Sequence, residues 1–223
     1  MTDISENQNS FFKTNYFLFS LTLLLVLSDQ ITKLIVKGYN FWGFEHKGLE
    51  YGENIKVFGD FLQWTFIENP GMAFGITFGS GKIFLSLFSV FASILLIILI
   101  HKIKSFNYQV RFGFTLILSG AVGNLIDRVF YGVIFNESPL FYGKVVDFIL
   151  VDIPDINFGN LYYTHWPVFN IADSCVTCGV VLLMFFNNYI PTYDEIKSGK
   201  PNIRNNSENS SNVLDRDELQ DEQ

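Results

Sequence analysis

Four long apolar segments divide the chain and predict membrane-spanning helices. A helix needs about 20 mostly apolar residues to cross the hydrocarbon core of a bilayer. The segments cover residues 16–36, 83–100, 112–134 and 168–190. The second carries no charged residue, whereas the other three carry polar residues near one end. The pattern predicts a polytopic membrane protein and excludes a soluble globular one.

The first apolar segment also has features of a secretory signal sequence. Its stretch 16–28 has the length of a signal-peptide apolar region. The residues before it are mostly polar, however, and contain a single basic residue, Lys13, where a signal peptide has a positively charged region. No small-residue cleavage site follows, and Asp29 and Lys33 interrupt the far end. These features favour a retained first span.

The distribution of basic residues predicts the orientation of the spans. The short connection 101–111 has three Lys or Arg residues, whereas the connections 38–81 and 135–167 are longer and poorer in them. By the positive-inside rule, the short connection and both termini lie in the cytoplasm. The two long loops, and the polar ends of three spans, then lie together on the extracytoplasmic side.

The predicted fold is an all-α membrane protein, a bundle of four transmembrane helices with a small extracytoplasmic β-sheet. The sheet is expected because apolar residues alternate with polar ones within 54–67. We expect a cytoplasmic segment at 1–15, a four-span domain at 16–190 with outer loops 38–81 and 135–167, and a disordered acidic cytoplasmic tail at 191–223.

Composition narrows the partners of the chain. It is 49% hydrophobic, and its formal net charge is -7. The tail has eight acidic and four basic residues and so supplies much of this negative charge. The rest of the chain is close to neutral and lacks the basic surface that nucleic-acid binding requires. The two cysteines, Cys175 and Cys178, lie in an apolar run, which favours a packing role over a redox pair.

The polar residues of three spans follow helical spacing. They are Asn124, Asp127 and Arg128 at i, i+3 and i+4, Asn170 and Asp173 at i and i+3, and Asp29 and Lys33 at i and i+4. Charged groups are costly near hydrocarbon, so these faces are expected to turn toward one another. Asp29 and Lys33 either form an ion pair that fixes the first span or help to position a substrate.

Two neighbouring carboxyl groups suit general acid–base chemistry. When two carboxylates lie close together, one keeps its proton and acts as an acid while the other acts as a base for water. The candidates are Asp127, Asp147 and Asp173, and burial of Asp147 in its apolar stretch is expected to raise its pKa. The sequence has no H-E-x-x-H metal motif, and its three histidines suit a serine mechanism poorly.

Five sequence blocks occur in a characteristic order. They are Asp29-Gln-Ile-Thr-Lys33, Asn69-Pro-Gly-Met-Ala-Phe-Gly75, Gly120-Ala-Val-Gly-Asn-Leu-Ile-Asp-Arg128, Val145-Val-Asp-Phe148 and Phe169-Asn-Ile-Ala-Asp173. Each block alone is a weak signal, but the ordered set resembles the lipoprotein signal peptidases (signal peptidase II). The resemblance covers nearly all of the chain except its two ends.

The resemblance implies an aspartic endopeptidase of the bacterial cytoplasmic membrane with its active site near the extracytoplasmic face. It would cut diacylglyceryl prolipoproteins just before the lipidated cysteine, as a monomer in membrane lipid and without a cofactor. The implied catalytic pair is Asp147 and Asp173, with Asp127 as the rival candidate. The residues expected to bind or orient the substrate are Asn69, Gly71, Asn124, Asp127, Arg128, Asn170, Asp29 and Lys33.

The sequence also departs from the compact members of this family. Extra residues lie between Arg128 and Val145, including 136–140, and between Phe148 and Phe169, including 152–160. Both insertions fall in predicted outer loops, where added length has a small cost in stability.

Two other functions fit the same residues, namely a proton-coupled transporter that uses the acids as a relay and a noncatalytic membrane protein.

Overall fold

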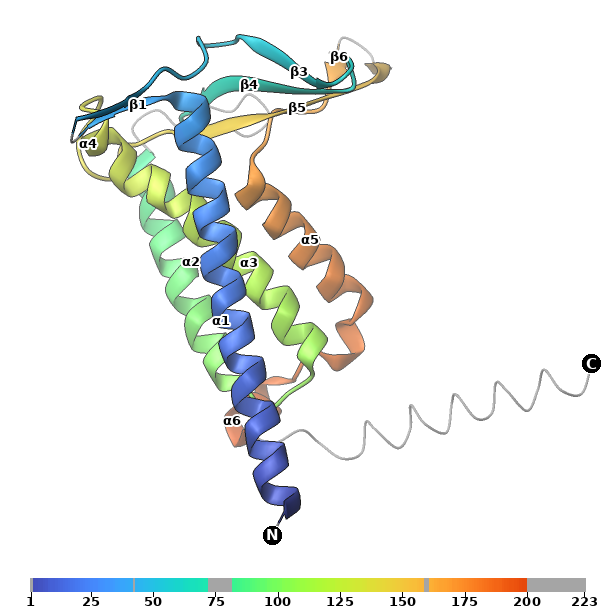
Figure 1. Ribbon diagram of the computed structural model, residues 1–223. Helices are drawn as coiled ribbons and strands as arrows, with labels where there is room; N and C mark the ends of the chain where they lie inside the picture. Colours follow the sequence, from blue (N-terminus) through green and yellow to red (C-terminus); the bar gives the residue numbers. More distant parts are fainter. Residues whose placement is uncertain (1, 42, 72–81, 159–160, 200–223) are drawn as a thin grey trace, which may run out of the picture.

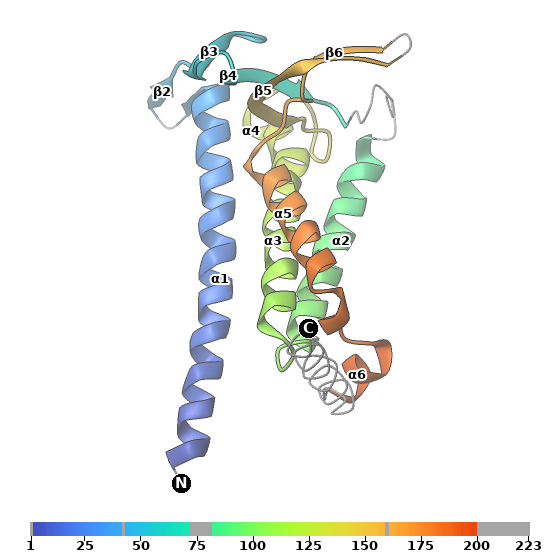
Figure 2. The same ribbon diagram turned by 90° about the vertical axis from the view of Figure 1, so that its right-hand side faces the viewer.

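Long helices stand side by side beneath an antiparallel β-sheet (Figure 1). The structure is a computed structural model that describes residues 2–41, 43–71, 82–158 and 161–199. The long helices are α1 (Thr2–Lys37), α2 (Lys82–Lys102), α3 (Tyr108–Ile126) and α5 (Ile171–Phe185). The start of α1 and the short helix α6 (Tyr193–Ser198) both lie at the end of the bundle opposite the sheet (Figure 2).

Three helices match the first three predicted spans. Asn15–Lys37, Lys82–Lys102 and Tyr108–Ile134 are each long and apolar enough to cross a membrane. The last of these runs from α3 through a π-helical turn, η2 (Asp127–Tyr131), into α4 (Gly132–Ile134). Large apolar side chains on α2 are exposed, including Phe84, Phe88, Phe91 and Ile97, while its serines Ser86 and Ser93 are buried. This arrangement is typical of a helix whose outer surface faces lipid.

The fourth predicted span is shorter and more bent than expected. Helix α5 has 15 residues, which is about 22 Å at 1.5 Å per residue and less than a bilayer core. Phe169 pairs with Ile149 of the sheet and Asn170 caps the helix, so α5 cannot begin at residue 168. The helical segment Asn187–Ser198 follows α5, but the chain bends by 79° between the two. Among the described residues, the helices therefore provide three candidate spans, or four if this bent pair counts as one.

Glycines bring α3 and α5 into close contact. A side chain on Gly120 would place its Cβ 2.1 Å from the backbone oxygen of Ala172 on α5. A Cβ on Gly123 would lie 2.7 Å from a carboxyl oxygen of Asp29 and 3.0 Å from the side chain of Ala172. The glycines thus serve close helix packing, as expected for membrane helices, and they hold α5 against the polar end of α3.

The sheet is built from both long connections. A two-stranded sheet pairs β1 (Tyr39–Phe41) with β2 (Phe44–His46), and a four-stranded antiparallel sheet has the order β3-β4-β5-β6. Strands β3 (Asn54–Phe58) and β4 (Leu62–Asn69) confirm the prediction of strands within 54–67. Strand β5 (Val145–Phe158) and strand β6 (Leu161–His165) were not predicted, and β5 incorporates residues 152–158 of the second insertion into the sheet.

A cluster of ion pairs joins the end of α1 to the sheet and to the first insertion. Lys37 pairs with Glu68 of β4 and with Glu137 of the insertion, and Lys144 pairs with the other oxygen of Glu68. These two lysines lower the pKa of Glu68 against the opposing effect of burial, which is the largest single influence. The cluster anchors the strand that leads directly into Asn69.

The predicted disordered tail begins with ordered structure. Thr192 caps α6 through a reciprocal capping box with Glu195, and Ser105 of the α2–α3 connection donates a hydrogen bond to the backbone oxygen of Gly199. For residues 193–198 the prediction of disorder is therefore wrong, because a good N-cap and a docking contact stabilise this short helix. Residues 200–223 lie outside the described part of the chain.

Candidate active site

Asp147 lies on the central strand β5, directly above the start of α5. The residue is 3% exposed. The side-chain amide of Asn170 donates to Oδ1 at 2.7 Å, and that of Asn69 donates to Oδ2 at 3.2 Å. Burial and the neighbouring charge of Asp173 raise the pKa of Asp147 to about 7, against the opposing effects of Asn69, Lys33 and Asn170. Asp147 therefore holds its proton far more readily than an ordinary aspartic acid does.

Asp173 lies in the first turn of α5, where two nitrogen donors fix its carboxyl group. The backbone N–H of Asn170 donates to Oδ2 at 3.2 Å, completing a capping box in which the Asn170 side chain accepts from the backbone N–H of Asp173. The amide of Asn124 on α3 donates to Oδ1 at 2.8 Å. Both carboxyl oxygens are thus oriented by neighbouring groups.

Asn170 connects the two acids. Its side chain contacts Asp147 and its backbone contacts Asp173, and its side chain also approaches Asn124 Oδ1 at 3.1 Å. Asn170 is fully buried. One residue, fixed between a strand and a helix, therefore holds together two carboxyl groups that are 26 residues apart in the sequence.

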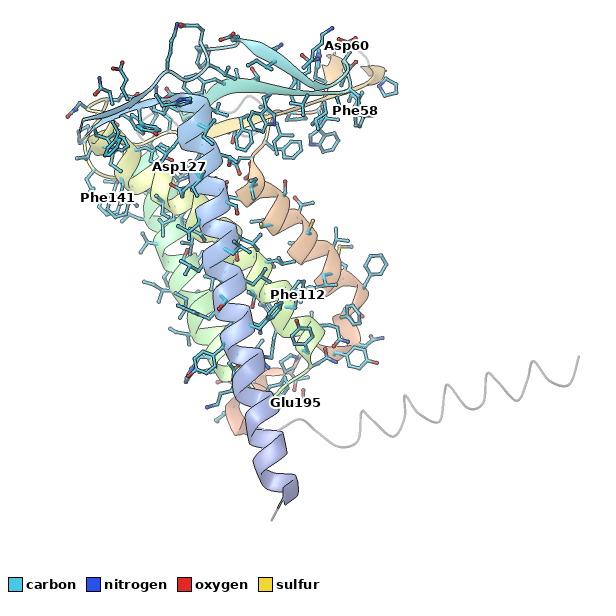
Figure 3. The ribbon with its side chains drawn as sticks, viewed as in Figure 1. Phe58, Asp60, Phe112, Asp127, Phe141 and Glu195 are labelled. Atoms are coloured by element: carbon cyan, nitrogen blue, oxygen red, sulfur yellow. The ribbon has the colours of Figure 1, made fainter. Side chains whose placement is uncertain are left out.

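A second polar cluster lies one hydrogen bond away from the acids. Lys33 Nζ lies 2.8 Å from Asp29 and 2.8 Å from Asp127, and it donates to Asn124 Oδ1 at 3.0 Å. Lys33, Asp29 and Asp127 are each at most 1% exposed. Figure 3 shows Asp127 at the end of the bundle beneath the sheet. Lys33 therefore fixes Asn124, which in turn orients Asp173.

The carboxylates of this second cluster also fix backbone. Asp29 Oδ1 accepts from the N–H of Ala172 at 2.9 Å, and Asp127 Oδ2 accepts from the N–H of Val146 at 3.1 Å. Ala172 directly precedes Asp173, and Val146 directly precedes Asp147. The cluster therefore positions the backbone beside each acid.

Gln30 belongs to this network, although sequence reasoning did not single it out. Its amide contacts Asp127 Oδ1 at 2.9 Å, the backbone oxygen of Gly123 at 3.1 Å and Asp29 at 3.2 Å. A glutamine beside Asp29 in an apolar segment was the available signal, because an amide in a span must find partners.

Arg128, Asn69 and Gly71 line a small cavity beside the acids. Its lining also includes Lys82, Ser86 and Gly143. The Arg128 charge interacts with Asp147 and Asp173, and its guanidinium lies 3.4 Å from the Ser89 hydroxyl. Gly71 has φ of 95°, a left-handed conformation that suits glycine, and donates to Asn69 Oδ1 at 3.0 Å.

The structure thus divides the predicted site residues into two groups. Asn69, Asn124 and Asn170 contact the acids directly, and Arg128 and Gly71 lie beside them. Asp29, Lys33 and Asp127 form the buried cluster behind Asn124 and leave no surface for a substrate to touch. Within the described ranges, no group of three or more His, Cys, Asp or Glu side chains is arranged to hold a metal ion.

Comparison with known proteins identifies the family. The model of the signal peptidase (SPase) II family matches residues 21–188. The chain belongs to the signal peptidase II family. It is a multi-pass membrane protease, which favours the peptidase interpretation over the transporter and the noncatalytic protein.

Individual members of the signal peptidase II family are similar over most of the chain. The lipoprotein signal peptidase of Pelodictyon phaeoclathratiforme is 36% identical over 172 residues, which cover 76% of this chain and 89% of the relative. That of Porphyromonas gingivalis is 35% identical over 191 residues, covering 74% and 80%. A bacterial membrane enzyme solved by the in meso method at 1.9 Å superposes with a TM-score of 0.55 at 30% identity, covering 77% of this chain and 92% of that one.

Proposed function

We propose that this signal peptidase II removes the signal peptide from diacylglyceryl-modified prolipoproteins by an aspartic mechanism, cutting before the lipidated cysteine. The observation that carries the proposal is the shared contact of Asn170 with Asp147 and Asp173. Two acids linked in this way, one with a raised pKa, suit general acid–base attack of water on an amide. The names of the relatives support the prolipoprotein substrate.

In the proposed reaction Asp147 is the acid and Asp173 is the base. Asp173 takes a proton from a water molecule while the oxygen of that water attacks the scissile carbonyl carbon. Asp147 then gives its proton to the leaving amine of the cysteine as the carbon–nitrogen bond breaks. Asn124 and Asn170 keep both carboxyl groups in place, which lowers the entropic cost of reaching the transition state.

The remaining predicted residues fall into two proposed roles. Asn69, Gly71 and Arg128 line the cavity beside the acids. Asn69 and Arg128 present amide and guanidinium donors to the carbonyl oxygens of the substrate backbone, and the N–H of Gly71 holds the Asn69 side-chain oxygen in place. Asp29, Lys33 and Asp127 position the catalytic elements from behind, without touching the substrate. This second role replaces the direct contact with substrate that the sequence left open for them.

The proposed orientation places the sheet and the acids at the extracytoplasmic surface. The basic connection between α2 and α3, the start of α1 and α6 lie at the opposite end of the bundle (Figure 2), which the positive-inside rule assigns to the cytoplasm. We propose that α5 with its bent continuation forms a fourth span. The protein then acts as a monomer in membrane lipid, with both termini cytoplasmic and the sheet covering the lipidated cysteine.

The substrate assignment is tested with a matched pair of peptides. One prolipoprotein peptide carries diacylglycerol on its cysteine and the other has a free thiol. We expect the purified protein to cleave the lipidated peptide and to release a fragment that begins with the modified cysteine, measured by mass spectrometry. Equal rates for the two peptides, or cleavage at another bond, would contradict the proposal.

The roles of the acids predict a fall in activity at alkaline pH. Because Asp147 must hold a proton and its pKa is about 7, kcat/KM is expected to drop about tenfold per pH unit above that value. The profile is measured by single-turnover cleavage from pH 5 to pH 9. The control is Asp152→Asn, which removes an exposed carboxylate from the same strand and is expected to leave the profile unchanged. A rate that rises through pH 7 would reverse the assignment of the acid.

A further inference from the structure

Part of the four-stranded sheet extends past the start of α5 and stands away from the tops of the helices. Strands β3 and β6 make their main contacts with other strands. Figure 1 shows the sheet extending sideways beyond the start of α5. We call this part the overhang and define it by residues 54–63, 149–152 and 165–166. At its inner end Leu150 is buried and Ile149 packs against the core, whereas Ile55, Phe58 and Trp166 farther out are exposed.

Strand register shows which side chains share the face that carries Asp147. Side chains of one strand alternate between faces, and directly paired residues share a face. Ile149 and Val151 therefore share the face of Asp147, and their partners on β4 are Trp64 and Leu62. On β3 the partners of these residues are Ile55 and Phe58.

Trp166 extends the same face beyond β6. Asp152 pairs with His165, and the N–H of Trp166 donates to the backbone oxygen of Val151 at 2.9 Å. Trp166 thus lies opposite Val151 and shares its face. The side chains of Ile55, Phe58 and Trp166 are 46%, 73% and 58% exposed, so this face ends in a wide apolar and aromatic surface.

The opposite face of the overhang is mostly polar. It carries Lys56, Gln63, Asp152 and His165 by the same pairing, together with Leu150, which pairs with Gln63 and is buried. Lys56 forms an ion pair with Asp60, and His165 lies 3.8 Å from Asp152. Figure 3 places Asp60 and Phe58 on opposite sides of the sheet, with Phe58 on the side nearer the helices.

We propose that the Asp147 face of the overhang binds the interfacial region of the lipid bilayer. The surface points in the direction of the membrane-spanning helices, and α5, which carries exposed apolar residues such as Val180 and Met184, descends below it. Tryptophan and phenylalanine are favoured at the boundary between headgroups and acyl chains. The Lys56–Asp60 ion pair on the opposite face remains in water, so the two faces of one sheet match the two sides of the lipid surface.

This contact sets the height of the catalytic site. Val151 lies four residues beyond Asp147 on the same strand, about 13 Å at 3.3 Å per residue. A lipid contact at Phe58 and Trp166 therefore holds β5, and with it the Asp147 carboxyl group, at a fixed distance from the membrane surface. The inference requires only that the helices span the bilayer and is independent of the substrate assignment.

Tryptophan fluorescence in vesicles tests the proposal. The natural tryptophans Trp42, Trp64 and Trp166 are replaced with phenylalanine, and a single tryptophan is introduced as Phe58→Trp or, on the opposite face, as Lys56→Trp. In vesicles of phosphatidylcholine brominated on its acyl chains, the emission of Phe58→Trp is expected to fall at least about twofold. A ring buried about 5–10 Å in the lipid lies close to the bromine atoms, which quench it. Lys56→Trp is expected to lose little.

Each other outcome overturns the proposal. Equal quenching at positions 56 and 58, or none at position 58, shows that this face does not bind lipid selectively. Emission of Phe58→Trp that depends on the protein-to-lipid ratio and not on bromine shows that a second copy of the chain covers the face. If Trp64→Phe prevents folding, Trp64 is kept and its own signal is subtracted.

Discussion

Replacing Asp147 or Asp173 with asparagine is expected to abolish cleavage while the protein stays folded. An amide keeps the shape of the carboxyl group, but it neither donates a proton to the leaving amine nor accepts one from water. Loss of general acid or base catalysis typically reduces rates 10²–10⁴-fold, so we expect kcat/KM to fall by about 10³-fold or more. Single-turnover cleavage of a lipidated peptide measures this fall independently of product release.

The stability of the Asp147→Asn variant separates catalysis from folding. The folded-state pKa of Asp147 is raised to about 7, above that of the unfolded chain. Its contribution to stability is therefore present at low pH and is lost as the pH rises through 7. Removing the charge should leave the unfolding temperature at pH 8 unchanged or higher. Asp152→Asn is the matched control on the same strand and should keep full activity. An active Asp147→Asn enzyme would refute the proposed roles.

The polar spacing along the spans was enough to predict which helical faces meet. A helix repeats every 3.6 residues, so Asp29 and Lys33 had to share a face, and so did Asn124 and Asp127. Burial of charge then required these faces to find each other, and the structure contains the expected Lys33–Asp29 pair at 2.8 Å. What spacing left undecided was the division of roles among the acids.

The role of Asp127 follows from tertiary contacts that lie outside its own helix. Lys33 comes from α1 and the N–H of Val146 comes from β5. Both partners are distant in the sequence, so no local pattern predicts that they bind the carboxylate of Asp127. Asp147 has no cation within contact distance among the described residues and is held by neutral amides. That difference separates a structural acid from a candidate catalytic one.

Strand β5 could not be recognised from its own residues. Asp147, Asp152 and Pro154 interrupt its apolar run, so the strand lacks a regular alternation. Its conformation is fixed by pairing with β4, whose residues lie about 80 positions earlier in the chain. By contrast, the start of α5 was visible in the sequence, because Asn170 followed by Asp173 at the third position forms a capping box. The prediction used this pair as a helical face and so extended the helix too far.

Replacing Lys33 with methionine is expected to destabilise the fold more than any other single substitution in the site. The change would leave Asp29 and Asp127, both almost completely buried, without the cation between them. Removing one partner of a buried ion pair typically costs about 3–5 kcal/mol, because the remaining charge is neither paired nor hydrated. Thermal unfolding in detergent measures the loss. Lys47→Met is the control, since Lys47 and Glu50 form an exposed pair worth at most about 1 kcal/mol.

A compensated variant tests whether the charges of this cluster serve stability or catalysis. In the combined Asp29→Asn, Lys33→Met, Asp127→Asn variant no uncompensated charge remains, and amide oxygens can still accept from Ala172 and Val146. Neutral replacement of a whole buried ionic cluster is often tolerated, so we expect most of the lost stability to return. Activity should return only in part, because Asn124 still lacks the Lys33 ammonium that fixes it against Asp173. Full recovery of both would show that Lys33 stabilises the bundle without positioning the acids. Recovery of neither would show that this cluster is required as an ionic unit.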